Sequence, residues 1–225
     1  MQNIKVAVDA VVFGYDKESG LNLLLIKRNI EPYKNAWALP GGLVKDSESL
    51  DEAVARELKE EAGLQTRYLE QLYTFGEPKR DPRNRVVSVA YFGVVRQSSF
   101  KLHASTDAAD AAWFSLESLP DLAFDHTEII KTARQRLKAK LTYQPVGFDL
   151  LDEKFLFSDL EHLYTSVLER PIDRRNFKKK IMQFGFLEQL AEKRKADGAG
   201  RPGNLYKFRT DIYNQLSNSG FIFDI

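Results

Sequence analysis

The stretch GLVKDSESLDEAVARELKEEAGL, residues 42–64, decides the fold of the first half of this chain. Ser49 with Glu52 three residues later makes a capping box, which predicts that a helix begins near residue 50. Apolar residues recur every three to four positions after it, as expected for a helix that packs one stripe against a core. Gly63 suits the left-handed conformation in which helices end. The stretch is therefore predicted to form a loop followed by one amphipathic helix.

Three glutamates, Glu57, Glu60 and Glu61, share one face of this predicted helix because they lie three and four residues apart. Carboxylates so close together repel one another, and Mg²⁺ prefers oxygen ligands of this kind. The sequence therefore predicts a site for Mg²⁺ or Mn²⁺ held by Glu57 and Glu61, with Glu60 assisting and the Gly42 carbonyl in reach. The alternative is a solvated acidic face, which would not require Arg56 and the glycines at set spacings.

The segment resembles the Nudix box at every defined position: Gly42, then Glu48, then Arg-Glu-Leu-Lys-Glu-Glu-Ala-Gly-Leu from residue 56. This resemblance implies an α+β fold, an α/β/α sandwich built on a mixed sheet. It also implies metal-dependent attack of water on a diphosphate. The catalytic residues that it implies are Glu61, Glu57, Glu60 and Arg56. Two questions stay open: whether the general base is Glu61 or a loop carboxylate, and whether the site hydrolyses its ligand or only binds it.

The length and composition set broad limits on the protein. It has 225 residues, enough for one large or two small domains, and no cysteine, which excludes disulfides and cysteine-based zinc sites. The net charge of +1 gives no indication of partners. The N-terminus lacks a basic region followed by an apolar run, so no signal peptide is predicted, and no stretch has the length of a membrane span. These features predict a cytoplasmic protein without a membrane partner.

Apolar patterning and turn signals predict the other elements of the first domain. The first two of four predicted strands form a hairpin. The strands are predicted at residues 4–15, 21–27, 68–75 and 86–95. Residues 96–111 are expected to be loop, followed by a short strand at residues 112–114. Asp125 with Glu128 makes a second capping box, so a helix is predicted from there to about residue 141. Pro145 and Gly147 then interrupt the pattern, which assigns the first domain to residues 1–144.

Basic residues beside an acidic metal site suit a diphosphate, because a cation neutralises one side of the phosphates and guanidinium groups the other. The loop at residues 76–85 carries several of them. Its end, Arg-Asp-Pro-Arg-Asn-Arg-Val-Val-Ser-Val-Ala-Tyr, resembles Nudix proteins that handle ADP-ribose, as does Phe-Asp-His at residues 124–126. The predicted ligand-binding residues are Arg28, Arg80, Arg83, Arg85 and His126. Surface ion pairs and a solvated loop are the alternatives.

Residues 149–225 have a pattern of their own and are predicted to form a second domain. A helix with a capping box at Ser158, a basic helix capped by Asp173, and two extended segments around a glycine-rich loop are typical of a winged helix-turn-helix. Between residues 170 and 207 there are 11 Lys and Arg against 4 Asp and Glu, a net charge of +7. A basic dimerisation or docking domain is the alternative. The predicted DNA-binding residues are Arg174, Arg175, Asn176, Lys178, Lys179, Arg201 and Lys207.

The two halves together resemble the NrtR-like group of Nudix-related transcriptional regulators. The matching stretches are Asp-Arg-Arg-Asn-Phe-Lys-Lys-Lys-Ile at residues 173–181 and Arg-Pro-Gly-Asn-Leu-Tyr-Lys-Phe at residues 201–208. This resemblance implies a homodimer that senses ADP-ribose or a related nucleotide sugar, binds operator DNA, and controls genes of NAD or sugar metabolism. Many such regulators have a degraded box, whereas this box is intact. The hypothesis from another class is therefore an ADP-ribose pyrophosphatase with an accessory C-terminal domain.

Overall fold

The computed structural model describes residues 3–66, 68–99, 102, 108–195, 202–219 and 221–225. The chain divides into two compact units, Met1–Arg136 and Leu137–Ile225. Within the described residues, no helix combines the length and the apolar composition that a membrane crossing requires.

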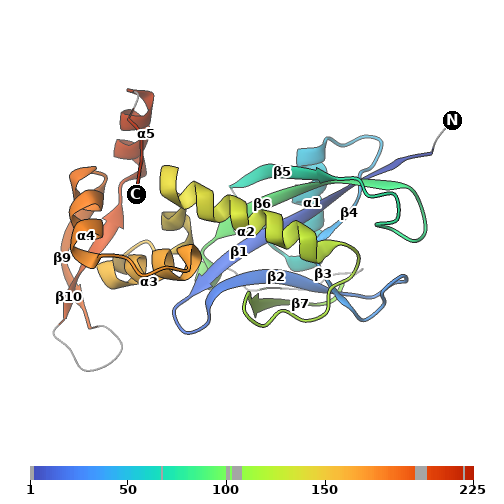
Figure 1. Ribbon diagram of the computed structural model, residues 1–225, viewed down its shortest axis with the longest axis horizontal. Coiled ribbons are helices and arrows are strands. Elements are labelled where there is room, and N and C mark those ends of the chain that lie inside the picture. The colour runs from blue at the N-terminus through green and yellow to red at the C-terminus, as the bar shows by residue number, and fades with distance from the viewer. Residues whose placement is uncertain (1–2, 67, 100–101, 103–107, 196–201, 220) are drawn as a thin grey trace. The chain divides into compact units, whose positions relative to one another are not determined.

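A seven-stranded mixed sheet forms the centre of the first unit (Figure 1). Its strands are β1 (Lys5–Asp16), β2 (Gly20–Arg28), β3 (Trp37–Ala38), β4 (Gly41–Leu43), β5 (Leu69–Phe75), β6 (Val86–Val95) and β7 (Ala108–Ser115). The main order is β3-β2-β1-β6-β5, while β4 pairs with β1 and β7 pairs with β2. β1 and β6 run parallel and the other pairs are antiparallel. The predicted mixed sheet and the β1–β2 hairpin are confirmed.

Helices α1 (Leu50–Ala62) and α2 (His126–Tyr143) lie on opposite faces of this sheet (Figure 1). On the α1 side, Val8 and Val12 of β1 pack in one buried cluster with Val54 and Leu58 of the helix. β1 side chains of the opposite face, such as Phe13, are buried too, so both faces of the strand are covered. This is the α/β/α sandwich that the sequence predicts.

The two signals that bound α1 in the sequence are confirmed in the structure. Ser49 accepts a hydrogen bond from the backbone N–H of Glu52 at 3.2 Å, and the Glu52 carboxylate accepts one from Ser49 N–H at 2.8 Å. Gly63 has a φ of 66°, and its N–H donates to carbonyl groups of the last turn. Capping at both ends therefore fixes which residues of the helix face the sheet.

Two expectations for the first unit need correction. Residues 108–111 were expected to be loop, but they begin β7, which pairs with β2 from Asn22 to Arg28. The short run of small residues has weak strand propensity, so pairing with a buried neighbour decides its conformation. A 3₁₀ turn, η1 (Gln97–Ser99), lies between β6 and β7. α2 begins at His126 as predicted. The predicted capping box is the second correction: the Asp125 carboxylate accepts hydrogen bonds from Arg80 of another loop, and Glu128 N–H donates to the Asp125 backbone carbonyl.

The second unit contains the helices and the hairpin that define a winged helix. Its elements after the end of α2 are η2 (Val146–Leu150), β8 (Phe155–Leu156), α3 (Phe157–Leu168), α4 (Arg174–Gln183), β9 (Leu187–Arg194), β10 (Gly203–Phe208) and α5 (Thr210–Asn218). The three strands form a sheet in the order β8-β10-β9. The order helix, helix, hairpin is as predicted, and α5 is an element that the sequence patterning did not reveal.

The helix starts in this unit show how well capping signals predict boundaries. Asp173 caps α4 as expected, since its carboxylate accepts a hydrogen bond from Asn176 N–H at 3.0 Å. The cap predicted at Ser158 was wrong. α3 begins earlier, because the Asp159 carboxylate accepts a hydrogen bond from Leu156 N–H at 2.9 Å and also binds Arg194 at 2.7 Å.

Tyr164 provides a test of the core of this unit. Its side chain is fully buried, and its hydroxyl has no hydrogen-bond partner among the described residues. An unsatisfied buried hydroxyl costs roughly 1–3 kcal/mol. Replacing Tyr164 by Phe is therefore expected to leave the free energy of unfolding unchanged or to raise it by about 1 kcal/mol, as measured by urea unfolding. A loss of stability on this substitution would mean that the hydroxyl is satisfied in solution.

Candidate functional site

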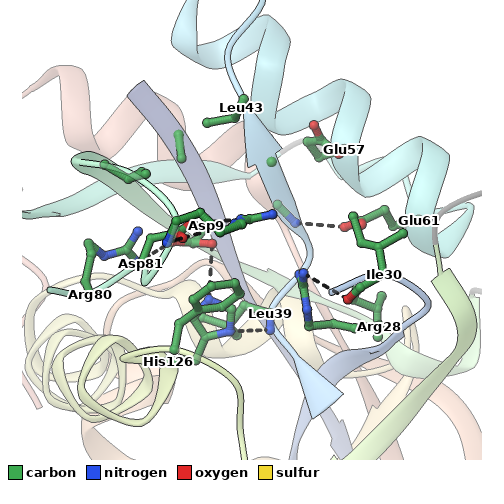
Figure 2. Close-up of a pocket in the computed structure, with 17 residues that line it drawn as sticks. Asp9, Arg28, Ile30, Leu39, Leu43, Glu57, Glu61, Arg80, Asp81 and His126 are labelled. Atoms are coloured by element: carbon green, nitrogen blue, oxygen red, sulfur yellow. Dashed lines mark hydrogen bonds and ion pairs between the residues drawn. The ribbon is translucent and has the colours of Figure 1, made fainter. Parts of the chain in front are cut away.

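A cavity of about 280 Å³ opens in the first unit beside β1 and β4. Figure 2 shows Glu57 and Glu61 projecting from α1 on the right, with Arg28 below Glu61, and Arg80, Asp81, Asp9 and His126 on the left. Both acidic and basic groups thus line the cavity.

The acidic side depends on two glycines that allow the chain to pass close to α1. A Cβ atom on Gly42 would lie 2.3 Å from Glu57 Oε1, and one on Gly41 would lie 2.2 Å from the carbonyl oxygen of Val8. The backbone contact at position 41 requires glycine, whereas a side chain at position 42 would displace the Glu57 carboxylate. Gly41 N–H also donates to Glu61 Oε2 at 2.8 Å. The two carboxylates are therefore positioned by the strand that precedes the helix.

Arg56 braces this acidic group. Its Nε and Nη2 atoms donate to the two oxygens of Glu48 at 2.8 and 2.6 Å, and Nη1 donates to Glu57 Oε1 at 2.7 Å and Glu60 Oε2 at 3.2 Å. Burial raises the pKa of the Glu57 carboxyl above its usual range, although the Arg56 hydrogen bond opposes the rise. One guanidinium thus holds three carboxylates, of which Glu57 lines the cavity.

A buried polar network forms the opposite wall. Arg80 donates from Nε and Nη2 to the two oxygens of Asp125 at 2.9 and 2.6 Å, and from Nη2 to Asp9 Oδ2 at 3.1 Å. The Ser88 hydroxyl donates to the same Asp9 oxygen. Burial alone would raise the pKa of Asp9, but its contacts with His126, Arg80 and Ser88 lower it to about 2. Asp9 is therefore ionised across the physiological pH range.

His126 links this network to the loop that carries the glycines. Its Nδ1 atom accepts a hydrogen bond from Leu39 N–H at 2.9 Å, so the proton of the neutral ring is on Nε2. Nε2 faces Asp9 Oδ1 at 3.4 Å. Since both ring nitrogens have protein partners and the side chain is buried, His126 positions the Leu39 loop, and only its ring face remains for a ligand.

The basic side of the cavity is built on an aromatic ring. The guanidinium carbon of Arg28 lies 4.8 Å from the centre of the Phe124 ring, and that of Arg83 lies 5.9 Å from it. Arg83 also forms a two-point ion pair with Asp81, at 3.0 and 2.8 Å. Burial and the positive charge of Arg83 lower the pKa of Arg28. An anion placed between the two guanidinium groups would relieve their repulsion.

In the second unit, α4 has one buried and one exposed face. Phe177 and Ile181 are buried, whereas the five residues that the sequence assigned to DNA are exposed. These are Arg174, Arg175, Asn176, Lys178 and Lys179. A net positive, exposed helix face of this kind suits the phosphates and groove of DNA.

Several of these side chains have protein partners as well. Arg174 Nε lies 3.2 Å from Glu161, and Asn176 Nδ2 donates to Asp173 at 3.0 Å. The ammonium of Lys178 lies 5.3 and 5.5 Å from two aromatic ring centres. Lys207, on β10, donates to Glu153 at 2.6 Å. Arg201, predicted at the wing, lies outside the described residues.

Comparison with known proteins agrees with both halves. A NUDIX domain model matches residues 3–133, and an NrtR DNA-binding winged helix domain model matches residues 147–208. A relative in Acinetobacter baylyi, an ADPR responsive transcriptional repressor, is 31% identical over 93% of this chain and 84% of its own length. The chain belongs to the NrtR group of Nudix proteins.

Two further known proteins are similar to this NrtR-type chain. The crystal structure of Shewanella oneidensis NrtR complexed with a 27mer DNA is 32% identical, with a TM-score of 0.78 and 97% of each chain covered. An ADP-ribose pyrophosphatase of Methanocaldococcus jannaschii is 43% identical over 126 residues, which are 56% of this chain and 70% of that protein. The chain is thus similar in sequence both to an NrtR protein and to a hydrolase.

Seven of the residues predicted for the Nudix site line the cavity. They are Gly42, Glu57, Glu61, Arg28, Arg80, Arg83 and His126. Three do not belong to the lining that the described residues form. Arg56 donates a hydrogen bond to Glu60, and Arg85 donates one to the backbone carbonyl of its neighbour Val86.

The sequence did not predict Asp9 and Phe124, which both line this NrtR-type cavity. Asp9 interrupts the apolar run at residues 6–13, and a lone acid in a buried strand was the signal available for it. Phe124 was noticed only as part of the Phe-Asp-His sequence. Its place beneath two arginines depends on contacts between segments far apart in the chain, which no local pattern reports.

The donor set fits a divalent cation. Mg²⁺ is commonly held by one or two carboxylates together with phosphate oxygens of its ligand. Glu57 and Glu61 face the cavity and supply the two carboxylates. In the described parts of the chain no cluster of three or more His, Asp or Glu side chains is arranged to hold a metal by itself. Water and the phosphate oxygens of a bound ligand would complete the coordination.

Proposed function

We propose that this chain is a transcriptional repressor that binds ADP-ribose in its first unit and operator DNA through its winged helix. It acts as a homodimer on genes of NAD or sugar metabolism, as the NrtR group implies. The observation that carries the proposal is the likeness along the whole chain to a regulator solved with DNA. The exposed basic face of α4 supports it independently.

The chemistry of the cavity supports a nucleoside diphosphate sugar as the effector. Arg28 and Arg83 offer two guanidinium groups to a diphosphate, and Phe124 adds an aromatic surface between them. Glu57 and Glu61 would hold Mg²⁺ or Mn²⁺ on the other side of the phosphates. Arg80 is paired with two carboxylates through Nε and Nη2, so in this proposal it holds the wall in place. The wording ADPR responsive in the name of the A. baylyi relative points to ADP-ribose itself.

The first test is the replacement of Arg175 by Ala. Arg175 is exposed on α4, and an arginine that contacts a base edge contributes roughly 1–3 kcal/mol. We expect affinity for DNA from the region upstream of the protein's own gene to fall about tenfold or more, as measured by gel shift. ADP-ribose affinity, measured by calorimetry, should not change. Lys17→Ala, which removes one exposed charge from the β1–β2 turn, is the matched control and should leave both affinities intact.

Equal losses of DNA and ADP-ribose affinity in Arg175→Ala would argue against separate sites. If the unmutated protein did not shift this DNA, with or without ADP-ribose, the repressor proposal itself would fail.

A second activity is favoured by the carboxylates that face the cavity. We propose that the Nudix site also hydrolyses ADP-ribose, with water attacking one phosphorus of the diphosphate and the bridging P–O bond breaking to give AMP and ribose 5-phosphate. The divalent cation, when bound, would neutralise charge on the phosphate oxygens. Glu57 and Glu61 would hold it, and Arg56 would keep Glu57 in position. The general base is Glu61 or a loop carboxylate. In this form the protein would both sense and remove its effector.

A further inference from the structure

The last residues of the chain, 221–225, form a tail that contacts α4 within the second unit. Phe223 is 2% exposed, and its ring centre lies 5.2 Å from that of Phe184, the C-cap residue that follows α4. Asp224 forms an ion pair with Lys180 of the same helix at 3.2 Å. The tail therefore contacts α4 both through the aromatic core and at the surface.

The same tail also binds the end of α2 in this unit. Ile225 N–H donates to the carbonyl oxygen of Thr142 at 3.0 Å. Thr142 lies in the last turn of α2, where carbonyl groups have no partner inside the helix. The tail thus connects two helices, α2 and α4, that are far apart in the sequence. It lies beyond residue 208, where the match to the winged helix model ends.

We propose that residues 221–225 position α4 for sequence-specific DNA binding, a role that rests on the proposed repressor function. Contacts with phosphates need charge and tolerate small movements, whereas contacts with base edges need a defined helix position. Phe223, Asp224 and Ile225 hold the C-terminal end of α4 against the body of the unit. They are positioning residues that do not themselves touch DNA.

Asp224→Asn is a useful test because a charge effect and a positioning effect would change operator affinity in opposite directions. The substitution removes a negative charge next to α4, so an effect of charge alone would strengthen binding to any DNA. The positioning role predicts that operator affinity falls about threefold, the scale of a surface ion pair, while affinity for unrelated DNA is unchanged or rises. Asp224→Glu should restore the operator affinity. Glu192→Gln removes a carboxylate of β9 from its exposed ion pair with Lys154, the residue before β8, and should not lower operator affinity.

Ile225→Pro tests the hydrogen bond to α2, because proline has no N–H to donate. Loss of this backbone hydrogen bond should lower operator affinity about fivefold, with affinity for unrelated DNA again unaffected. Amide hydrogen exchange at residues 180–185 should become faster in both variants. This second measurement needs no DNA, so it separates the tail proposal from the repressor proposal.

If operator affinity stayed the same or rose in both variants, and exchange at the end of α4 did not change, the positioning role would be wrong. Faster exchange in a protein that binds no DNA would instead support the tail contacts and reject the repressor function.

Discussion

Replacing Glu61 by Gln is expected to lower Mg²⁺-dependent release of AMP from ADP-ribose by about a hundredfold or more, the scale on which one electrostatic group contributes to catalysis. Glu61 faces the cavity and accepts a hydrogen bond from Gly41 N–H at 2.8 Å. A glutamine has the same shape and keeps an oxygen for that N–H, so the glycine loop should stay in place. What the substitution removes is the negative charge that a divalent cation requires.

Glu60→Gln on the same helix is the matched control. The Glu60 side chain is 51% exposed, binds Arg56, and does not belong to the cavity lining that the described residues form. We expect it to lower AMP release by less than about tenfold. Chromatographic measurement of AMP, with ADP-ribose binding followed in parallel, checks both variants. Equal losses of AMP release in Glu61→Gln and Glu60→Gln would show that facing the cavity does not decide which glutamate matters for catalysis. Absence of AMP release by the unmutated protein would leave effector sensing as the only role of the site.

The acidic half of this site could be predicted from the sequence because its determinants are local. Capping by Ser49 and Gly63 fixes the helix, and the helical period then places Glu57 and Glu61 on one side. The opposite wall could not be predicted in this way. It is assembled from β1, the loop before β6 and the start of α2, and its ion pairs join residues 45 and 71 positions apart. The sequence predicts Arg80 as a ligand residue, but it does not show that the same guanidinium pairs with two carboxylates inside the fold.

The second unit shows the same division between local and distant determinants. The Asp173 cap and the period of α4 predicted which side chains point outward, and the structure has them exposed. The sequence did not indicate that Asn176 donates to Asp173 or that Lys178 lies beside aromatic rings. These contacts hold two of the predicted DNA-binding side chains, so Arg175 is the more informative position for mutation.

Replacing Arg80 by Met is expected to lower the free energy of unfolding of the first unit by about 3–5 kcal/mol, the cost of breaking a buried ion pair by removing one partner. The Arg80 side chain is 5% exposed, and its partners Asp9 and Asp125 are 9% and 21% exposed. Methionine fills much of the same space but leaves Asp9 buried without the guanidinium. Arg80→Lys keeps the charge but not the two-point geometry and should lose less.

The pH dependence of this loss follows from Asp9. Its pKa of about 2 is below the usual value of about 3.9. A carboxyl whose pKa is lowered by folding stabilises the folded state above about pH 4, and that stabilisation is lost as the pH falls toward 2. The stability difference between the unmutated protein and Arg80→Met should therefore be largest above pH 4 and should shrink below it. Urea unfolding at pH 7, 4 and 3 measures this difference.

Arg28→Met separates the structural role of Arg80 from a role in binding. Arg28 lines the same cavity but donates to the carbonyl oxygens of Pro32 and Ile30 and is only half-buried. We expect its loss to weaken ADP-ribose binding about tenfold, the effect of losing one charged hydrogen bond, with little change in stability. Arg80→Met should lower the free energy of unfolding and, under conditions in which it remains folded, should change ADP-ribose affinity little. If Arg80→Met instead lost ADP-ribose affinity at unchanged stability, its guanidinium would be a ligand for the phosphates, and Asp9 and Asp125 would be held by other means.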